Sequence, residues 1–140
     1  MLLSIRIAGE VNLDGSVSEF LSRLRMRRKY SAVLMQNTPE NVATLNKLRD
    51  VVAFGPIDEA TLKELIKARA QMKDTTKKLD VDKTLTQVQK EDHNEWDIKP
   101  FFRLHPPRGG IDSRLHFGVS KKAVLGNNKE KINELVRRML

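Results

Sequence analysis

Apolar residues alternate with polar ones at the start of the chain and predict a β-strand. Leu3, Ile5 and Ile7 occupy every second position, and a period of two is typical of a strand with one buried face. We expect a half-buried strand whose other face carries Ser4 and Arg6. Apolar runs at 30–35 and 51–54 predict a second and a third strand.

Between these strands, apolar residues recur every three or four positions, which is the spacing of one helical face. Ser16, with Glu19 three residues later, fits a capping box at the start of the first helix. Thr38 followed by Pro39 is expected to open the second helix, and Asp58 is expected to cap the third. The alternation of strands and helices predicts a compact two-layer α/β (α+β) unit, with the helices on one face of the sheet. It leaves the strand order and the strand directions open.

Residues 71–99 differ from the core predicted at 1–70 because they are polar and contain few apolar residues. We interpret 71–99 as a polar peripheral excursion that is partly mobile in the free protein. Leu85 and Val88 are expected to share one face of a short helix there, and Trp96 to pin the return of the chain.

The last segment, 100–140, resumes the strand pattern at 101–105 and again at 115–119. These two stretches predict an extended basic hairpin arm with 106–113 at its tip. Asn128 is expected to cap a C-terminal helix packed on the core. One face of that helix carries Ile132, Leu135, Val136 and Met139.

Composition narrows the class of protein. The chain has 140 residues, 39% of them hydrophobic and 31% charged, which suits one folded domain. It has no cysteine, so disulfides and thiolate metal sites are excluded. No apolar run reaches the ~20 residues that span a bilayer. The charged start does not resemble a signal peptide, so we expect a cytoplasmic protein.

Positive charge gathers in two zones, and the net charge is +8. Such an excess favours a polyanionic partner. The first zone comprises Arg23, Arg25, Arg27, Arg28 and Lys29. The second comprises Lys99, Arg103, Arg108, Arg114, Lys121 and Lys122, with Asp112 as its acid. The alternative is that both zones are merely solvated surfaces.

The run 102–110 is the most informative stretch of the second zone. Pro106 and Pro107 hold the backbone extended, and Gly109 and Gly110 remove side chains where a partner could approach closely. His105, beside the arginines of this run, adds a hydrogen-bonding group. A rigid, bare, cationic loop suits a phosphate surface, although a plain turn with solvated arginines would have the same composition.

Aromatic residues are few, and Phe101, Phe102 and Phe117 are expected to lie mainly in the core, with at most one exposed for stacking. A binder that stacks rows of bases needs more exposed rings. The pattern therefore favours phosphate and sugar contacts to a folded nucleic acid over contacts to base edges.

An enzymatic alternative depends on Asp92, His93, Glu95 and Asp97, which lie close in sequence but in the polar excursion. His105 and His116 would face each other across the predicted hairpin, but neighbouring arginines would repel a metal ion. Gly109-Gly110 matches no nucleotide-binding fingerprint. A free-standing regulatory RNA- or DNA-binding protein is a further alternative, and it would use the same basic surfaces.

Three stretches resemble archaeal-type members of the L-thirty family of large-subunit ribosomal proteins, called L-seven in eukaryotes. They are Ile5-Arg6-Ile7-Ala8-Gly9-Glu10-Val11-Asn12, then Val51-Val52-Ala53-Phe54-Gly55 with the helix at 61–69, and finally 102–110, the most specific of the three. The bacterial form resembles only the first 55 or so residues, so the rest is similar to the archaeal and eukaryotic extension.

The resemblance implies a small βαβαβ core of ferredoxin-like character and a structural role in the large ribosomal subunit, in the cytoplasm. It implies contacts to large-subunit ribosomal RNA near 5S RNA and to neighbouring ribosomal proteins. It implies no catalysis, no cofactor, no metal, no membrane and no small-molecule substrate. We call residues 103–110 the signature loop. We expect the ribosomal RNA contacts to come from the two basic zones and this loop: Arg25, Arg27, Arg28, Lys29, Arg103, His105, Arg108, Gly109, Gly110, Arg114, Lys121 and Lys122.

Overall fold

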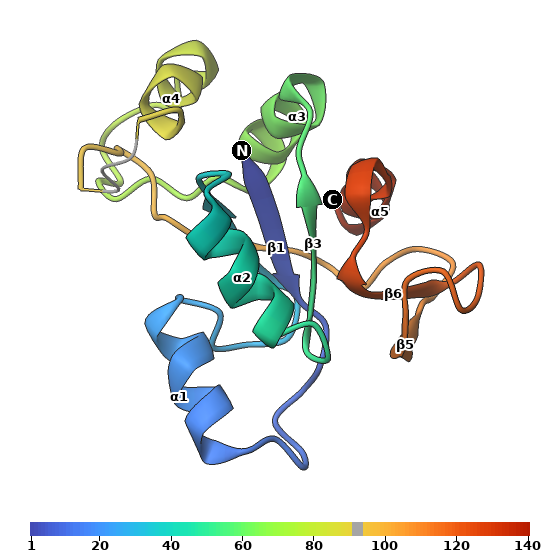
Figure 1. Ribbon diagram of the computed structural model, residues 1–140. Coiled ribbons are helices and arrows are strands. Elements are labelled where there is room, and N and C mark those ends of the chain that lie inside the picture. The colour runs from blue at the N-terminus through green and yellow to red at the C-terminus, as the bar shows by residue number, and fades with distance from the viewer. Residues whose placement is uncertain (91–93) are drawn as a thin grey trace.

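The computed structural model describes residues 1–90 and 94–140 and shows a twisted mixed sheet flanked by helices (Figure 1). The strands are β1 (Leu2–Arg6), β2 (Ser31–Met35), β3 (Val52–Pro56), β4 (Phe102–Arg103), β5 (Asp112–His116) and β6 (Ala123–Asn127). The helices are α1 (Gly15–Arg23), α2 (Pro39–Lys47), α3 (Glu59–Arg69), α4 (Val81–Val88), the short 3-10 helix η1 (Lys129–Lys131) and α5 (Ile132–Met139). No helix in this described part is long and apolar enough to cross a membrane.

The sheet has the strand order β4-β2-β1-β3-β6-β5. β1 lies in the centre and is antiparallel to both β2 and β3, whereas β6 is parallel to β3 and β5 is parallel to β6. The predicted α/β class, its β1-α1-β2-α2-β3 core and its C-terminal helix are confirmed.

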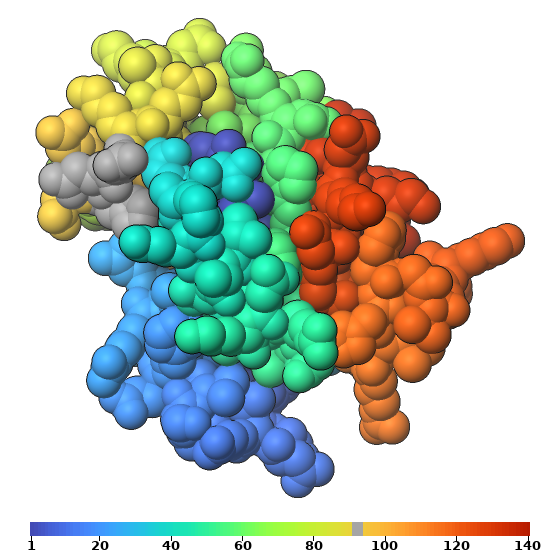
Figure 2. Space-filling model, viewed as in Figure 1, coloured from blue at the N-terminus to red at the C-terminus, as the bar shows by residue number. Residues whose placement is uncertain are grey.

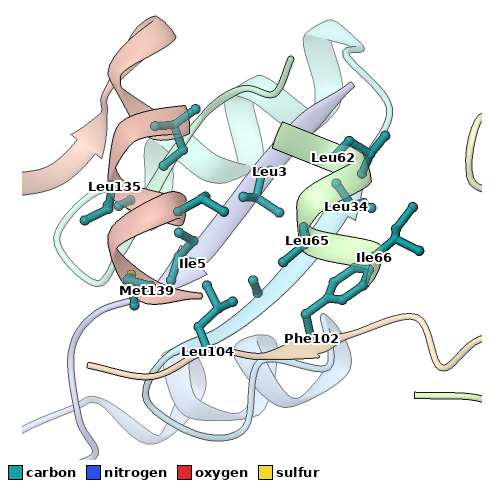
Figure 3. Close-up of a cluster of buried hydrophobic side chains, with 14 of the residues drawn as sticks. Leu3, Ile5, Leu34, Leu62, Leu65, Ile66, Phe102, Leu104, Leu135 and Met139 are labelled. Carbon is teal, nitrogen blue, oxygen red and sulfur yellow. The ribbon is translucent and has the colours of Figure 1, made fainter. Parts of the chain in front are cut away.

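Helices cover both faces of the sheet, which differs from the expected packing on one face. Leu3 and Ile5 of β1 face α3 and α5, where they meet Leu65 and Leu135 (Figure 3). Leu2 belongs to a second core under α1 and α2. All five residues of β1 are therefore buried. Alternate residues of β1 do point to opposite faces of the sheet, but each face packs against its own core and neither face is exposed to solvent.

The helix starts follow local hydrogen bonding. Thr38 caps α2 as predicted, because its hydroxyl accepts a bond from the Asn41 N–H at 3.3 Å. Asp14, and not Ser16, is the N-cap of α1, since its carboxylate accepts bonds from the Ser16 N–H at 3.4 Å and hydroxyl at 3.0 Å. Asp58 is the N-cap of α3, but its side chain makes no capping bond.

The predicted hairpin arm is wrong. β4 pairs with β2 at one edge of the sheet, and β5 pairs with β6 at the opposite edge. The chain between them crosses beside α5 and is held by backbone bonds, from His105 N–H to Met139 O at 2.9 Å and from Arg108 N–H to Arg138 O at 3.0 Å. Alternation predicts that a stretch is a strand, but it does not identify the partner of that strand.

The polar excursion carries α4, which packs beside α3 (Figure 1). Leu85 and Val88 of α4 are buried, and Trp96 is only 1% exposed, so these three residues attach the excursion to the core as expected. Its two ends meet in a short antiparallel bridge between Met72 and Ile98.

The C-terminal helix α5 buries the predicted apolar face of Ile132, Leu135, Val136 and Met139. Asn128 is the N-cap residue of η1, the 3-10 turn that leads into α5, but its side chain makes no capping bond. Its side-chain amide donates instead to the Gly126 carbonyl at 3.0 Å.

Candidate nucleic-acid interface

The loop between α1 and β2 carries four exposed cations: Arg25, Arg27, Arg28 and Lys29. We call residues 25–29 the basic loop. Arg25 and the following Tyr30 both have φ of 64°, a left-handed conformation that costs an L-residue ~1 kcal/mol. Met26 is fully buried between them and anchors the loop. Because its backbone is strained, the loop needs support from the rest of the fold.

Arg6 of β1 supplies that support. Its guanidinium group lies beneath the loop and donates to the carbonyls of Met26 at 3.0 Å and Arg27 at 2.6 Å. It also donates to Ala8 O at 3.0 Å and Gly9 O at 3.2 Å. Burial lowers the pKa of Arg6, while Glu10 acts in the opposite direction. Sequence reasoning placed Arg6 on the open face of a half-buried strand, and the one available signal was a lone cation within an apolar alternation.

A cleft of about 510 Å³ separates the basic loop from the strand β4. Its lining includes the apolar side chains of Pro100 and Phe101 and the polar residues Ser22, Ser31 and Asn94. The cations that line it are Arg25, Arg27, Arg28, Lys73, Lys99 and Arg103. The pairing of β4 with β2 sets Arg103 opposite Ser31 and so brings Lys99 and Arg103 of the second zone to the first zone. The two zones of the sequence are thus partly one surface.

Five of these cations form no ion pair with an acid in the part of the chain that the structure describes. The described residues that line the cleft include no aspartate or glutamate. Arg25, Arg27, Arg28, Lys99 and Arg103 form no ion pair within residues 1–90 and 94–140. By contrast, Arg23 of the first zone pairs with Glu19 at 2.6 Å. Five exposed cations around one cleft create a positive potential that attracts polyanions.

The other cations of the second zone lie towards the opposite edge of the sheet. Arg114 on β5 shares a hollow with Lys29 and the exit of β1. Lys121 shares a different hollow with Lys131 and Arg138, and Lys122 is exposed beside it. In Figure 2 the orange segment that contains β5 projects on the side of the molecule away from the blue α1 region.

The signature loop lies against the end of α5. The Arg138 guanidinium donates to the Arg108 carbonyl at 3.0 Å and to the Gly110 carbonyl at 2.7 Å. Pro107 is buried, so the loop is less bare than expected, while the His105 and Arg108 side chains are exposed. Gly109 and Gly110 have φ of 80° and 72°, values that favour glycine. The glycines therefore serve the loop's own backbone conformation as well as leaving it uncovered.

The structure describes two of the four residues of the enzymatic alternative, Glu95 and Asp97. Asp92 and His93 lie outside the described residues. Glu95 binds Lys90 at 3.3 Å. The described part of the chain contains no cluster of three His, Cys, Asp or Glu side chains that could hold a metal ion.

His116 does not face His105 as expected. Its Nε2 contacts Asp50 at 2.8 Å, and this contact joins β5 to the turn that precedes β3.

Comparison with known proteins identifies relatives of this chain. No protein-family model matches the chain. It is similar to the large ribosomal subunit protein uL30 of Methanobrevibacter smithii, with 32% identity over 153 residues and 100% of both chains covered. It is also similar to the proteins of the same name from Hyperthermus butylicus (33% identity, 97% of this chain and 88% of that protein) and Pyrobaculum islandicum (32% identity, 97% and 92%).

These relatives match the chain almost from end to end, so the likeness includes β4, the signature loop and α5 as well as the βαβαβ core. The identity exceeds 30% in each of the three comparisons. The chain therefore belongs to the uL30 family and is a non-enzymatic, structural constituent of the large ribosomal subunit in the cytoplasm.

Proposed function

We propose that the protein binds large-subunit ribosomal RNA through the cleft between the basic loop and β4, and makes a second set of contacts from the signature loop and β5. The observation that carries the proposal is the convergence of Arg27, Arg28 and Arg103 on one cleft without a described acid. Neither basic zone alone would build that site, because β4 must pair with β2 to bring Arg103 there.

The chemistry of this site is phosphate neutralisation. Arginine binds phosphate oxygens with two parallel hydrogen bonds, and each neutralised phosphate releases condensed counterions. Affinity supplied in this way falls steeply with salt. The basic loop is held by Arg6, and Arg103 is held by strand pairing, so the backbone that carries these cations loses little freedom on binding.

The test replaces Arg27, Arg28 and Arg103 together by Ala. Its matched control replaces Lys47, Lys63 and Lys67, three exposed lysines on α2 and α3, and removes the same charge. Binding to a large-subunit RNA fragment is measured between low and moderate salt. We expect the slope of log affinity against log salt to become shallower by roughly 2–3 in the arginine variant, with little change in the control. Equal slopes for the two variants would contradict the proposal.

The same variants can be followed in ribosome assembly. After a high-salt wash, the lysine variant should sediment with large subunits and the arginine variant should be depleted from them. A protein that the wash strips from subunits in its wild-type form would instead behave as a regulatory RNA-binding protein.

The signature loop supports a further part of the proposal, a position close to 5S RNA. Arg108 is exposed beside a loop that α5 holds in place. Because the chain contains no cysteine, Arg108→Cys creates one attachment point for a photo-crosslinker, with Lys78→Cys in the excursion as the control. Crosslinks to 5S RNA or to the large-subunit RNA beside it are expected from position 108 alone. Crosslinks from position 108 only to distant RNA segments would remove this part of the proposal.

A further inference from the structure

We propose that the cleft beside β4 receives one unpaired base of the RNA, stacked against the flat pair formed by Phe101 and Arg103. This inference rests on the proposed function and names the class of nucleotide that the cleft takes. The Arg103 guanidinium carbon lies 5.8 Å from the centre of the Phe101 ring, and both residues line the cleft. Unpaired bases are commonly recognised by stacking on aromatic rings and on arginine planes.

The sheet explains why this ring is accessible. Phe102 is completely buried on the α3 and α5 side, so its neighbours Phe101 and Arg103 lie on the opposite face of the sheet. On that face the second core lies over β1, β2 and β3, and β4 is the edge strand beyond it. Phe101 packs against the margin of this core and is only half-buried.

The composition of the cleft fits a whole nucleotide better than a phosphate alone. A phosphate site needs cations and donors, and Arg25, Arg27 and Arg28 supply them. It does not need apolar side chains, yet Pro100 and Phe101 also line the cleft. A base stacked on Phe101 would leave its sugar and phosphate among the arginines, and the volume of about 510 Å³ is in the range of small-ligand sites.

A matched control exists on the same molecule. Lys131 lies over the ring of Phe117 at 5.7 Å, almost the same separation as in the Phe101–Arg103 pair. Phe117 is also half-buried, but it borders the hollow that contains Lys121 and does not line the cleft. Phe101→Leu and Phe117→Leu therefore each remove one ring and keep an apolar side chain.

The probe is an RNA hairpin with a single 2-aminopurine in its loop, compared with a blunt RNA duplex of equal phosphate number. We expect Phe101→Leu to weaken hairpin binding by about tenfold, a typical loss for one stacked base, and to leave duplex binding and the salt dependence unchanged. Phe117→Leu should bind both RNAs as the wild type does. The 2-aminopurine fluorescence should fall when the wild-type protein binds, and this change should be lost in Phe101→Leu.

A second measurement does not depend on the folding of a variant. Wild-type protein is given the same hairpin with an abasic nucleotide at the probe position, and its affinity should fall as much as in Phe101→Leu. Equal binding of the intact and abasic hairpins would overturn the inference even if the salt slope confirmed the phosphate contacts. Adenosine monophosphate that competed as tightly as the hairpin would also overturn it, because the cleft would then be a site for free nucleotides.

Discussion

Arg6 is a buried cation whose four hydrogen bonds all go to main-chain carbonyls. A charge taken out of water is costly unless its hydrogen bonds are satisfied. Here the carbonyls come from two loops, the exit of β1 and the basic loop, so one side chain joins both. The proposed binding surface thus depends on a residue that lies beneath it and is only 1% exposed.

Replacing Arg6 by Met should destabilise the protein by about 3 kcal/mol, because one buried and three partly buried carbonyls lose their donor at once. Urea denaturation measures this loss. Arg23→Met, at a side chain that is 73% exposed, is the control and should cost well under 1 kcal/mol. If the two variants unfolded at the same urea concentration, Arg6 would not be the residue that holds the basic loop in place.

At the scale of elements, the excursion that carries α4 is attached by a polar network as well as by buried apolar residues. The Asp97 carboxylate accepts hydrogen bonds from Gln87 of α4 at 2.8 Å and from Lys77 at 3.2 Å. The hydrogen bond from Gln87 is the main cause that lowers the pKa of Asp97, and the hydrogen bond and positive charge of Lys77 lower it further. This acid thus connects α4 to the returning chain, and it is a structural contact in place of the catalytic group considered from the sequence.

A lowered pKa in the folded state predicts a definite pH dependence. Asp97 stabilises the fold at any pH above the range in which an aspartate of the unfolded chain protonates, and this contribution disappears as the pH falls through the lower folded value. Stability measured by urea denaturation between neutral and strongly acidic pH should therefore fall less steeply in Asp97→Asn than in the wild type. Parallel curves for the two proteins would show that the carboxylate charge does not contribute.

At the scale of the whole molecule, the six-stranded sheet separates the two surfaces that we propose bind RNA. β4 and β5 occupy its opposite edges. Five strand spacings of roughly 4.8 Å each place these edges on the order of 24 Å apart. That span exceeds the Debye length of ~8 Å at physiological salt, so cations at one edge have little direct effect on those at the other.

The two surfaces should therefore act independently on one RNA. Removing Lys99 and Arg103 beside β4 and, separately, Lys121 and Lys122 beyond β5 should each reduce affinity, and the losses in binding free energy should add in the fourfold variant to within about 0.5 kcal/mol. Filter binding of all four combinations at one salt concentration measures this. If the fourfold variant bound RNA as tightly as the weaker-binding double variant, both pairs of cations would belong to a single site.

The sequence predicted most of the elements and few of the contacts between them. A period-two pattern located the first strand, apolar runs located the second and third, and the spacing of Ile132, Leu135, Val136 and Met139 located α5. Pattern alone could not pair β4 with β2 or β5 with β6, because hydrogen-bonding partners far apart in sequence leave no local mark. The cleft was missed for that reason, since it exists only where Arg103 meets the basic loop.

The crossing of the chain from β4 to β5 beside α5 bears on the order in which the new protein matures during its own synthesis. The strands β1, β2 and β3 emerge early and can pair with one another. The wall of the cleft opposite the basic loop comes from β4, and the segment that follows is fastened to carbonyls of Arg138 and Met139. A nascent chain can thus assemble its scaffold first, and the proposed RNA-binding cleft is complete only after α5 has left the exit tunnel.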